Sequence, residues 1–312
     1  MGSNFISICI PAFKRIEFLE RLLDSVSIQE FKDFEVVVTD DSPGDEVRLL
    51  CARYQDKFLL HYYKNARTLG TPENWNEAMR QAKGKWIKLM HDDDWFSRKD
   101  SLGIFAAMAA KAGDKLIISY YTNVYLEDGR EERVKPSLLR VNRLLKNPVA
   151  ILSQNIIGPP SVIMHRNDKK CFYDHNLKWL VDIDFYIARL KYEKLQYIEQ
   201  ALVHVGLGEE QVTMLCHSRP EIEIPENFYL LQKTGIHHLK NIMVYDAWWR
   251  LLRNLKIKDE THLRDYEDGP WPGIILRILR DVRRVPHWMI NLGVVSKLAM
   301  TISYLKNVRT TR

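Results

Sequence analysis

Short apolar runs alternate with amphipathic stretches through the first 121 residues of the chain. The apolar runs end at turn-forming residues and predict strands at residues 5–10, 34–39, 58–63, 86–90 and 115–121. Between them, apolar side chains at three- and four-residue spacing predict helices at residues 17–28, 45–54, 73–82 and 97–112. Such alternation is typical of βαβ units, so we expect an α/β fold with a mostly parallel sheet flanked by helices.

The regular alternation fades after residue 123. One helical stretch stands out at residues 181–191, and a long helical pattern runs from residue 226 to residue 257. At ~150 residues per domain, a chain of 312 residues suggests one large domain or two smaller ones. We expect the chain to divide into residues 1–123, 124–215 and a helical region at 216–312.

Three polar clusters follow predicted strands directly. They are Pro11-Ala12-Phe13-Lys14-Arg15, Asp40-Asp41-Ser42 and Asp92-Asp93-Asp94. Ligands of open α/β sheets bind outside the carboxyl ends of the strands. Since the fold would bring these distant clusters to one edge, we expect the binding site there.

The run of Asp92, Asp93 and Asp94 suggests a metal site. Three consecutive carboxylates raise one another's pKa, and a divalent cation relieves that repulsion. Magnesium and manganese prefer carboxylate and phosphate oxygens. The alternative is a solvated turn that caps the helix beginning at Ser97. The position after an apolar strand and beside Trp95 favours the metal.

Other polar residues have two interpretations each. A carboxylate of Asp40 or Asp41 suits a nucleobase or ribose hydroxyl, but Asp-Ser-Pro-Gly also forms Asx-turns. Arg15 and Arg67 suit a diphosphate, or are solvated surface charges. Asp182 suits a general base at a cleft edge, or a helix cap.

Composition excludes several classes of protein. Hydrophobic residues make up 46% and charged residues 28%, as in soluble globular proteins. The four cysteines are scattered, which fits a reducing compartment. We see no signal peptide, no membrane-spanning run, and no GxSxG, Walker or GxGxxG motif. We therefore expect a cytoplasmic protein.

The positive charge is concentrated at one end. From Arg277 onward the chain has eight Lys or Arg and one acidic residue, a net charge of +7, so the remainder carries −1. Apolar residues from Trp271 to Val282 recur at helical spacing between these arginines. We expect residues 271–305 to contact the inner face of the cell membrane peripherally, with packing on the main body as the alternative. Nucleic acid is not expected, because the body offers no continuous basic groove.

Several segments, in order, resemble family-two GT-A glycosyltransferases of the bacterial polysaccharide and O-antigen type. They lie at residues 8–15, 36–42, 74–76, 82–95, 158–161 and 179–184, within the first two-thirds of the chain. The resemblance implies a Rossmann-like GT-A fold with a helical C-terminal extension. It also implies inverting transfer of a sugar from a nucleoside-diphosphate donor to a hydroxyl of a glycan or lipid-linked glycan.

The resemblance further implies roles for individual residues. Asp182 would be the catalytic base, and Asp93 and Asp94 would bind Mn²⁺ or Mg²⁺ as the DxD motif does. Residues 1–123 would bind the nucleotide sugar and 124–215 the acceptor. The donor-binding residues would be Pro11, Phe13, Arg15, Asp40, Asp41, Arg67, Asn74 and Asp92.

Two departures keep alternatives open. His91 stands where the DxD motif has its first carboxylate, so the ligand among Asp92, Asp93 and Asp94 is not fixed. Gln211-Val212-Thr213 lacks the histidine that precedes it in some relatives. A nucleotidyltransferase is one alternative, although the cluster after the first strand has no glycine. The other is a membrane-associated scaffold that has kept the fold and lost catalysis.

Overall fold

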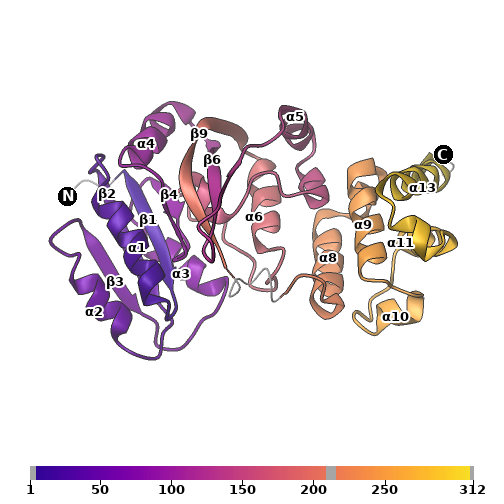
Figure 1. Ribbon diagram of the computed structural model, residues 1–312, viewed down its shortest axis with the longest axis horizontal. Coiled ribbons are helices and arrows are strands. Elements are labelled where there is room, and N and C mark those ends of the chain that lie inside the picture. The colour runs from indigo at the N-terminus through magenta and orange to yellow at the C-terminus, as the bar shows by residue number, and fades with distance from the viewer. Residues whose placement is uncertain (1–4, 209–215, 310–312) are drawn as a thin grey trace.

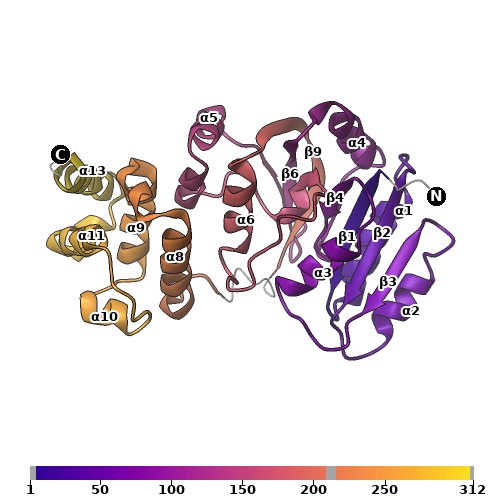
Figure 2. The ribbon, with the colours of Figure 1, turned by 180° about the vertical axis from the view of Figure 1, so that it is seen from behind.

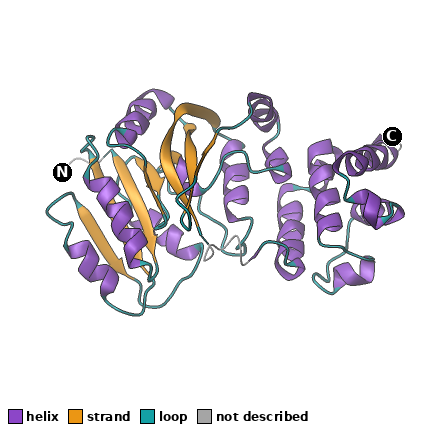
Figure 3. Cartoon of the chain, in the orientation of Figure 1, coloured by secondary structure: helices purple, strands orange, loops and turns teal. Residues whose placement is uncertain are grey.

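The computed structural model describes residues 5–208 and 216–309, so Gln211-Val212-Thr213 lies outside the described residues. Figures 1 and 3 show two regions, one built on a sheet and one built only of helices. The strands of the described residues form one nine-stranded sheet in the order β3-β2-β1-β4-β8-β6-β9-β5, with β7 paired to β6. They are β1 (Ile6–Ala12), β2 (Phe34–Asp40), β3 (Leu60–Lys64), β4 (Trp86–Leu89), β5 (Asp94–Phe96), β6 (Lys115–Tyr125), β7 (Glu131–Val134), β8 (Ile163–Arg166) and β9 (Lys194–Leu207).

The first four strands are parallel, because a helix between each strand and the next returns the chain to the same end of the sheet. Those helices are α1 (Ile16–Ser27), α2 (Glu46–Ala52) and α3 (Glu73–Gln81), and α4 (Ser101–Ala112) follows β5. Helices α1 and α2 lie on one face of the sheet and α3 on the other (Figures 1 and 2). β1 and β2 are buried along their whole length, as their apolar sequences predict. The predicted α/β fold is confirmed.

The second half of the sheet is mixed. β6 pairs with β9 in parallel, whereas β8 is antiparallel to both β4 and β6. The predicted boundary at residue 123 falls within β6, so the sheet runs continuously across it. The strands β5, β7, β8 and β9 were not predicted. β5 and β8 are short, and β9 pairs with β6 across register shifts at Ser119 and Tyr120, which disturb the alternation of side chains.

The remaining regular elements of the described residues are helices. They are α5 (Leu138–Lys146), η1 (Pro148–Ser153), η2 (Pro160–Val162), α6 (Val181–Leu190), α8 (Pro220–Thr234), η3 (Ile236–Lys240), α9 (Ile242–Asn254), α10 (Glu260–Arg264), α11 (Gly273–Arg284), α12 (His287–Ile290), α13 (Gly293–Tyr304) and η4 (Leu305–Arg309). The long helix predicted over 226–257 is broken, because Gly235 adopts a φ of 113° and Asn241 then caps α9. α8 lies between α6 and α9 in both views (Figures 1 and 2).

The apolar core of the sheet region continues into the C-terminal helices. Trp248 and Trp249 of α9 are buried, and α11 and α13 both pack on α9. Ile275, Ile278 and Leu279 of α11 are buried in this contact. The apolar face predicted for α11 therefore packs on α9 within the C-terminal region, whereas the alternative interpretation placed it on the main body. No helix in residues 5–208 or 216–309 combines the length and apolarity that a bilayer crossing requires.

Candidate active site

A cleft of 920 Å³ opens where β1 and β4 end. Its walls come from the ends of these strands, from the start of α3 and from the start of α6. The clusters expected to meet at one edge of the sheet thus do meet. The predicted site residues that line the cleft are Pro11, Phe13, Arg15, Asp41, Asn74, Asp92, Asp93, Asp94 and Asp182.

Asp40 and Asp41 are neighbours in sequence but lie in different surroundings. Asp40 is fully buried and accepts hydrogen bonds from Tyr62 Oη (2.7 Å) and Lys64 Nζ (2.9 Å). Burial by itself raises the pKa of Asp40, but the hydrogen bonds it accepts outweigh burial and lower the pKa below its usual value. Asp40 therefore supports the strand end from behind the cleft, and is not among the residues that line it.

Asp41 faces the cleft from a rigid setting. Its carboxylate accepts hydrogen bonds from Asn65 Nδ2 (2.7 Å) and from the backbone N–H groups of Leu69 (3.0 Å) and Gly70 (2.8 Å). Asn74 joins the same loop, because its Oδ1 accepts from Asn65 Nδ2 at 2.9 Å. The polar segment before α3 thus serves to orient Asp41. Arg67, which belongs to this segment, is exposed and does not line the cleft.

Arg15 contacts the acidic cluster within the wall formed by the ends of β1 and β4. Its guanidinium donates to both oxygens of Asp92 and, at 3.1 Å, to Asp93 Oδ2. Burial raises the pKa of Asp92 to about 7 even though Arg15 opposes this shift. Burial and the neighbouring charge of Asp93 raise the pKa of Asp94 well above its usual value. The positive charges near the cluster, those of Arg15, Arg21 and Lys88, thus do not offset the effect of burial on Asp92 and Asp94.

His91, Asp93 and Asp94 form a group that suits a divalent cation. One ligand atom from each lies within 4.8 Å of the others. Burial lowers the pKa of His91 to about 4, so its imidazole is neutral at physiological pH and keeps a lone pair for a metal. Two carboxylates and an imidazole match the preferences of Mn²⁺, whereas Mg²⁺ favours an all-oxygen set. The residues present therefore fit a divalent metal ion.

Lys88 lies beneath this group, in the middle of β4. Its side chain is fully buried, and its Nζ donates to the carbonyl of Ser161. Ser161 Oγ in turn accepts from the backbone N–H of His91 at 2.9 Å. Burial lowers the pKa of Lys88 to about 7, although Asp94 opposes this. Ser161 therefore joins the buried amine to the backbone of the acidic motif.

Asp182 stands on the wall formed by the first turn of α6. Asn155 Nδ2 donates to its Oδ2 and the backbone N–H of Ile183 to its Oδ1, each at 2.8 Å. Burial raises the pKa of Asp182 to about 6. A carboxylate with such a pKa is ionised at neutral pH and is a stronger base than an exposed aspartate, which suits proton abstraction.

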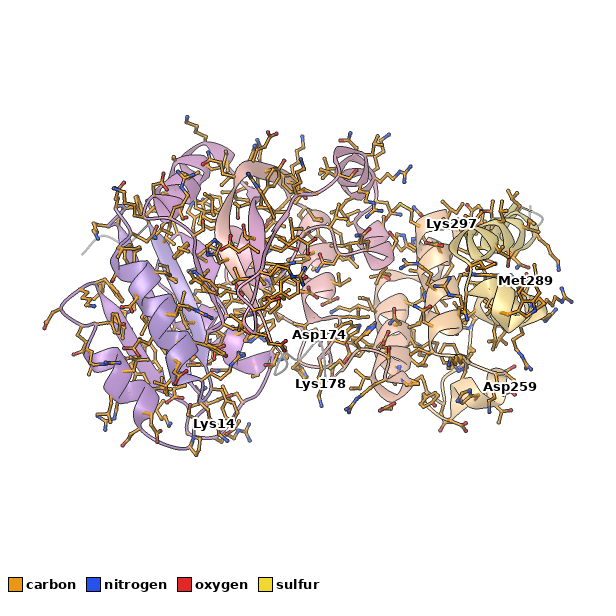
Figure 4. All side chains as sticks on the ribbon, in the orientation of Figure 1. Lys14, Asp174, Lys178, Asp259, Met289 and Lys297 are labelled. Atoms are coloured by element: carbon orange, nitrogen blue, oxygen red, sulfur yellow. The ribbon has the colours of Figure 1, made fainter. Side chains whose placement is uncertain are left out.

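The segment that leads into α6 is held by α8. The carboxylate of Glu226 accepts from three successive backbone N–H groups, those of Lys178 (2.8 Å), Trp179 (2.9 Å) and Leu180 (2.8 Å). Lys233, two turns further along α8, bridges Asp174 at 2.6 Å and Asp184 at 2.8 Å. Figure 4 places Asp174 and Lys178 between the sheet and α8. The C-terminal region thereby fixes the wall that carries Asp182.

Several of these residues were not predicted to belong to the site. A lysine inside the apolar run WIKLM was a signal for Lys88, and His91 was noted only as a departure from the motif. Asn155 and Glu226 gave no signal, because each acts through a contact with a distant segment. Their roles follow from tertiary packing.

Comparisons with known proteins agree with this arrangement. Residues 7–172 match the sequence profile of Glycosyl transferase family 2, which is more than half of the chain. A Campylobacter jejuni relative, GalNAc(5)-diNAcBac-PP-undecaprenol beta-1,3-glucosyltransferase, is 32% identical over 91 residues, or 28% of this chain. That match covers only 29% of the relative's length, so the likeness concerns a part of that protein.

Two solved structures share the fold over almost the whole chain. TarS 1-349 of S. aureus in complex with UDP-GlcNAc superimposes with a TM-score of 0.62 and 19% identity, covering 98% of this chain and 90% of TarS 1-349. Mannosyltransferase PcManGT of Pyrobaculum calidifontis, in complex with GDP-Man and Mn²⁺, has a TM-score of 0.57 and 11% identity, covering 99% and 87% of the two chains. At these identities the likeness establishes the common fold.

Proposed function

The chain belongs to glycosyl transferase family 2, and from this membership we propose that it transfers a sugar from a nucleoside-diphosphate donor to an acceptor hydroxyl. The family confirms the glycosyltransferase class predicted from the sequence. The donor, the metal dependence, the inverting course and the acceptor are our proposals. One observation carries them: Asp41, Asp93 and Asp182 come from three distant segments and line a single cleft.

The nucleoside diphosphate would lie along the ends of β1 and β4. The immobilised carboxylate of Asp41 suits a base N–H or a ribose hydroxyl, and Pro11 and Phe13 offer apolar surface beside it. Arg15 lies within the same wall and supplies positive charge for phosphate oxygens. The roles predicted for Asp40 and Arg67 are not part of this proposal, because neither lines the cleft.

His91, Asp93 and Asp94 would hold the divalent ion, for which Mn²⁺ is the expected species. When bound, such an ion would stabilise the negative charge that develops on the departing diphosphate. The chain contributes preorganised ligands, since the N–H of Gly206 donates to Asp94 Oδ1 at 3.2 Å and Ser161 holds the backbone of His91. That PcManGT was crystallised with Mn²⁺ supports this choice of ion.

Asp182 would take the proton of the acceptor hydroxyl. The base is held by Asn155 and the backbone of Ile183, so that one carboxylate orientation is favoured. Attack on the sugar carbon from the side opposite the departing diphosphate would invert its configuration. General base catalysis of this kind contributes ~10²–10⁴-fold.

The acceptor we propose is a glycan or a lipid-linked glycan, with the protein at the inner face of the cell membrane and residues 271–305 in contact with it. The name of the Campylobacter jejuni relative, which includes an undecaprenol-linked glycan, supports a lipid-linked acceptor. The basic C-terminal residues support the membrane contact.

A thermal-shift panel with purified protein tests the proposal. Nucleoside diphosphates and sugar nucleotides would be added with and without Mn²⁺, and transfer or slow hydrolysis of the stabilising sugar nucleotide would then be measured. We expect one nucleoside diphosphate to stabilise the protein in a Mn²⁺-dependent manner. Release of pyrophosphate would indicate a nucleotidyltransferase instead, and binding without turnover a scaffold that has lost catalysis.

A further inference from the structure

Helix α13 exposes an apolar stripe to solvent. Val294, Leu298 and Ile302 follow one another at four-residue spacing, and their exposed fractions are 75%, 61% and 67%. Leu305 continues the stripe, and Trp288 on α12 is 72% exposed beside it in sequence. We call Val294, Leu298, Ile302 and Leu305 the outer stripe. Monomeric proteins seldom leave a row of this kind uncovered.

The inner side of the same helix buries two serines, Ser296 and Ser303, beside Met300. Ser296 Oγ accepts from Trp249 Nε1 at 3.0 Å, and Ser303 lies 2.6 Å from Tyr245 Oη. Ser303 also donates to Asp281 Oδ2 at 2.8 Å. In an ordinary surface helix the apolar side faces the protein and the polar side faces water. α13 departs from this pattern because its outer side carries three exposed apolar residues, and the hydrogen bonds of Ser296 and Ser303 hold it in this orientation.

The basic residues around the outer stripe favour an anionic lipid surface as its partner. Arg280, Arg283, Lys297 and Lys306 are all exposed in the same part of the chain. Two of them form ion pairs within the protein, Lys297 with Asp246 at 3.0 Å and Lys306 with Asp281 at 3.8 Å, and the four exposed cations outnumber these two acids. A second copy of this face would bring like charges together, whereas an anionic lipid surface would attract them, at roughly 1 kcal/mol per basic residue. An exposed tryptophan is also typical of the lipid–water interface.

We propose that the outer stripe of α13 inserts into the headgroup region of an anionic bilayer, with the helix lying in the membrane plane. α11 does not insert, since its apolar residues pack on α9. The outer stripe is the surface that would make the membrane contact proposed above for residues 271–305, and the inference rests on that proposal. It does not depend on any catalytic step. Figure 4 shows Met289 and Lys297 at the end of the molecule opposite Lys14, so the contact leaves the sugar-nucleotide cleft uncovered.

Vesicle flotation with the full chain tests the inference. We expect binding to vesicles of equal parts phosphatidylcholine and phosphatidylglycerol, and much weaker binding to pure phosphatidylcholine or in high salt. A double variant, Leu298→Ser with Ile302→Ser, should lower the partition coefficient about tenfold or more. Both side chains are exposed, so folding should survive. The matched control is Leu49→Ser with Leu59→Ser, which removes exposed apolar side chains from the sheet region and should bind as the wild type does.

The outcomes separate this inference from the proposed function. Absence of wild-type binding to anionic vesicles, or equal loss in the control variant, would overturn it. A dimer in light scattering that dissociates in the Leu298→Ser, Ile302→Ser variant would assign the stripe to a second copy instead. Asp182→Asn should still bind vesicles, and the double variant should still be stabilised by the nucleotide, so that neither test depends on the other.

Discussion

Replacing Glu226 tests whether α8 holds the catalytic wall in place. Its carboxylate accepts three backbone N–H groups just before α6, and its side chain lies far along the sequence from the residues it holds. Glu226→Ala would remove all three hydrogen bonds and leave the N–H of Leu180 buried without its partner. Glu226→Gln would keep one acceptor oxygen and should have an intermediate effect.

The magnitude follows from the number and burial of these bonds. Hydrogen bonds to charged groups contribute about 1.5–3 kcal/mol each, and unpaired buried donors cost more than exposed ones. Since water can reach the N–H groups of Lys178 and Trp179, which are only partly buried, we expect Glu226→Ala to lower the free energy of unfolding by about 3 kcal/mol. For a chain of this size that corresponds to a fall of about 5 °C in Tm.

Activity should respond separately from stability. A displaced first turn of α6 misplaces Asp182 relative to the acceptor, and errors of about 1 Å cost up to about 100-fold. We expect kcat to fall about tenfold or more at a temperature where the variant is folded, with the Kd for the nucleoside diphosphate unchanged. Glu221→Ala is the matched control, because Glu221 is an exposed acid on the same helix. An unchanged Tm and kcat in Glu226→Ala would refute the role assigned to α8.

The remaining predictions concern the cleft itself. Asp93→Ala should abolish the Mn²⁺-dependent part of the thermal shift, and a persistent shift would exclude Asp93 as a ligand. Asp182→Asn should keep donor binding but lower transfer ~10²–10⁴-fold, and surviving transfer would show that the base lies elsewhere. Because Asp182 must be ionised to accept a proton, and burial raises its pKa to about 6, kcat/KM should fall as the pH drops below about 6. Asn155→Ala removes a hydrogen bond that lowers the pKa of Asp182, so the fall in kcat/KM should begin at a higher pH in this variant. A fall at the same pH as in the wild type would contradict the role of Asn155.

Local patterns in the sequence were sufficient to predict most of the strands and helices of the first half of the chain. Apolar runs such as Phe34–Asp40 and the helical spacing in Ile16–Ser27 depend on neighbours in sequence, so the strands and helices of the first half follow from them. The edge at which the polar clusters meet also follows, because parallel strands carry their carboxyl ends to one side. The acidic run could therefore be assigned to this edge without coordinates, whereas Asp182 was placed in the same site only by the resemblance to family-two GT-A glycosyltransferases.

Other features depended on contacts between distant segments. The separate surroundings of Asp40 and Asp41 arise because Lys64 and Tyr62 on β3 pair with one carboxylate and the loop before α3 with the other. A sequence shows two adjacent aspartates and no sign of which one will face the cleft.

The orientation of α13 is the clearest case. The sequence predicted a membrane contact for residues 271–305 as one stretch, with packing on the main body as the alternative. In the structure the apolar side of α11 packs on α9, whereas contacts of Ser296 with Trp249 and of Ser303 with Tyr245 leave the outer stripe of α13 facing outward. Periodicity reveals that a helix has two faces, since that depends only on the geometry of the backbone. Which face turns to the protein is decided by the partners that the fold places beside it, and those become known only from the tertiary structure.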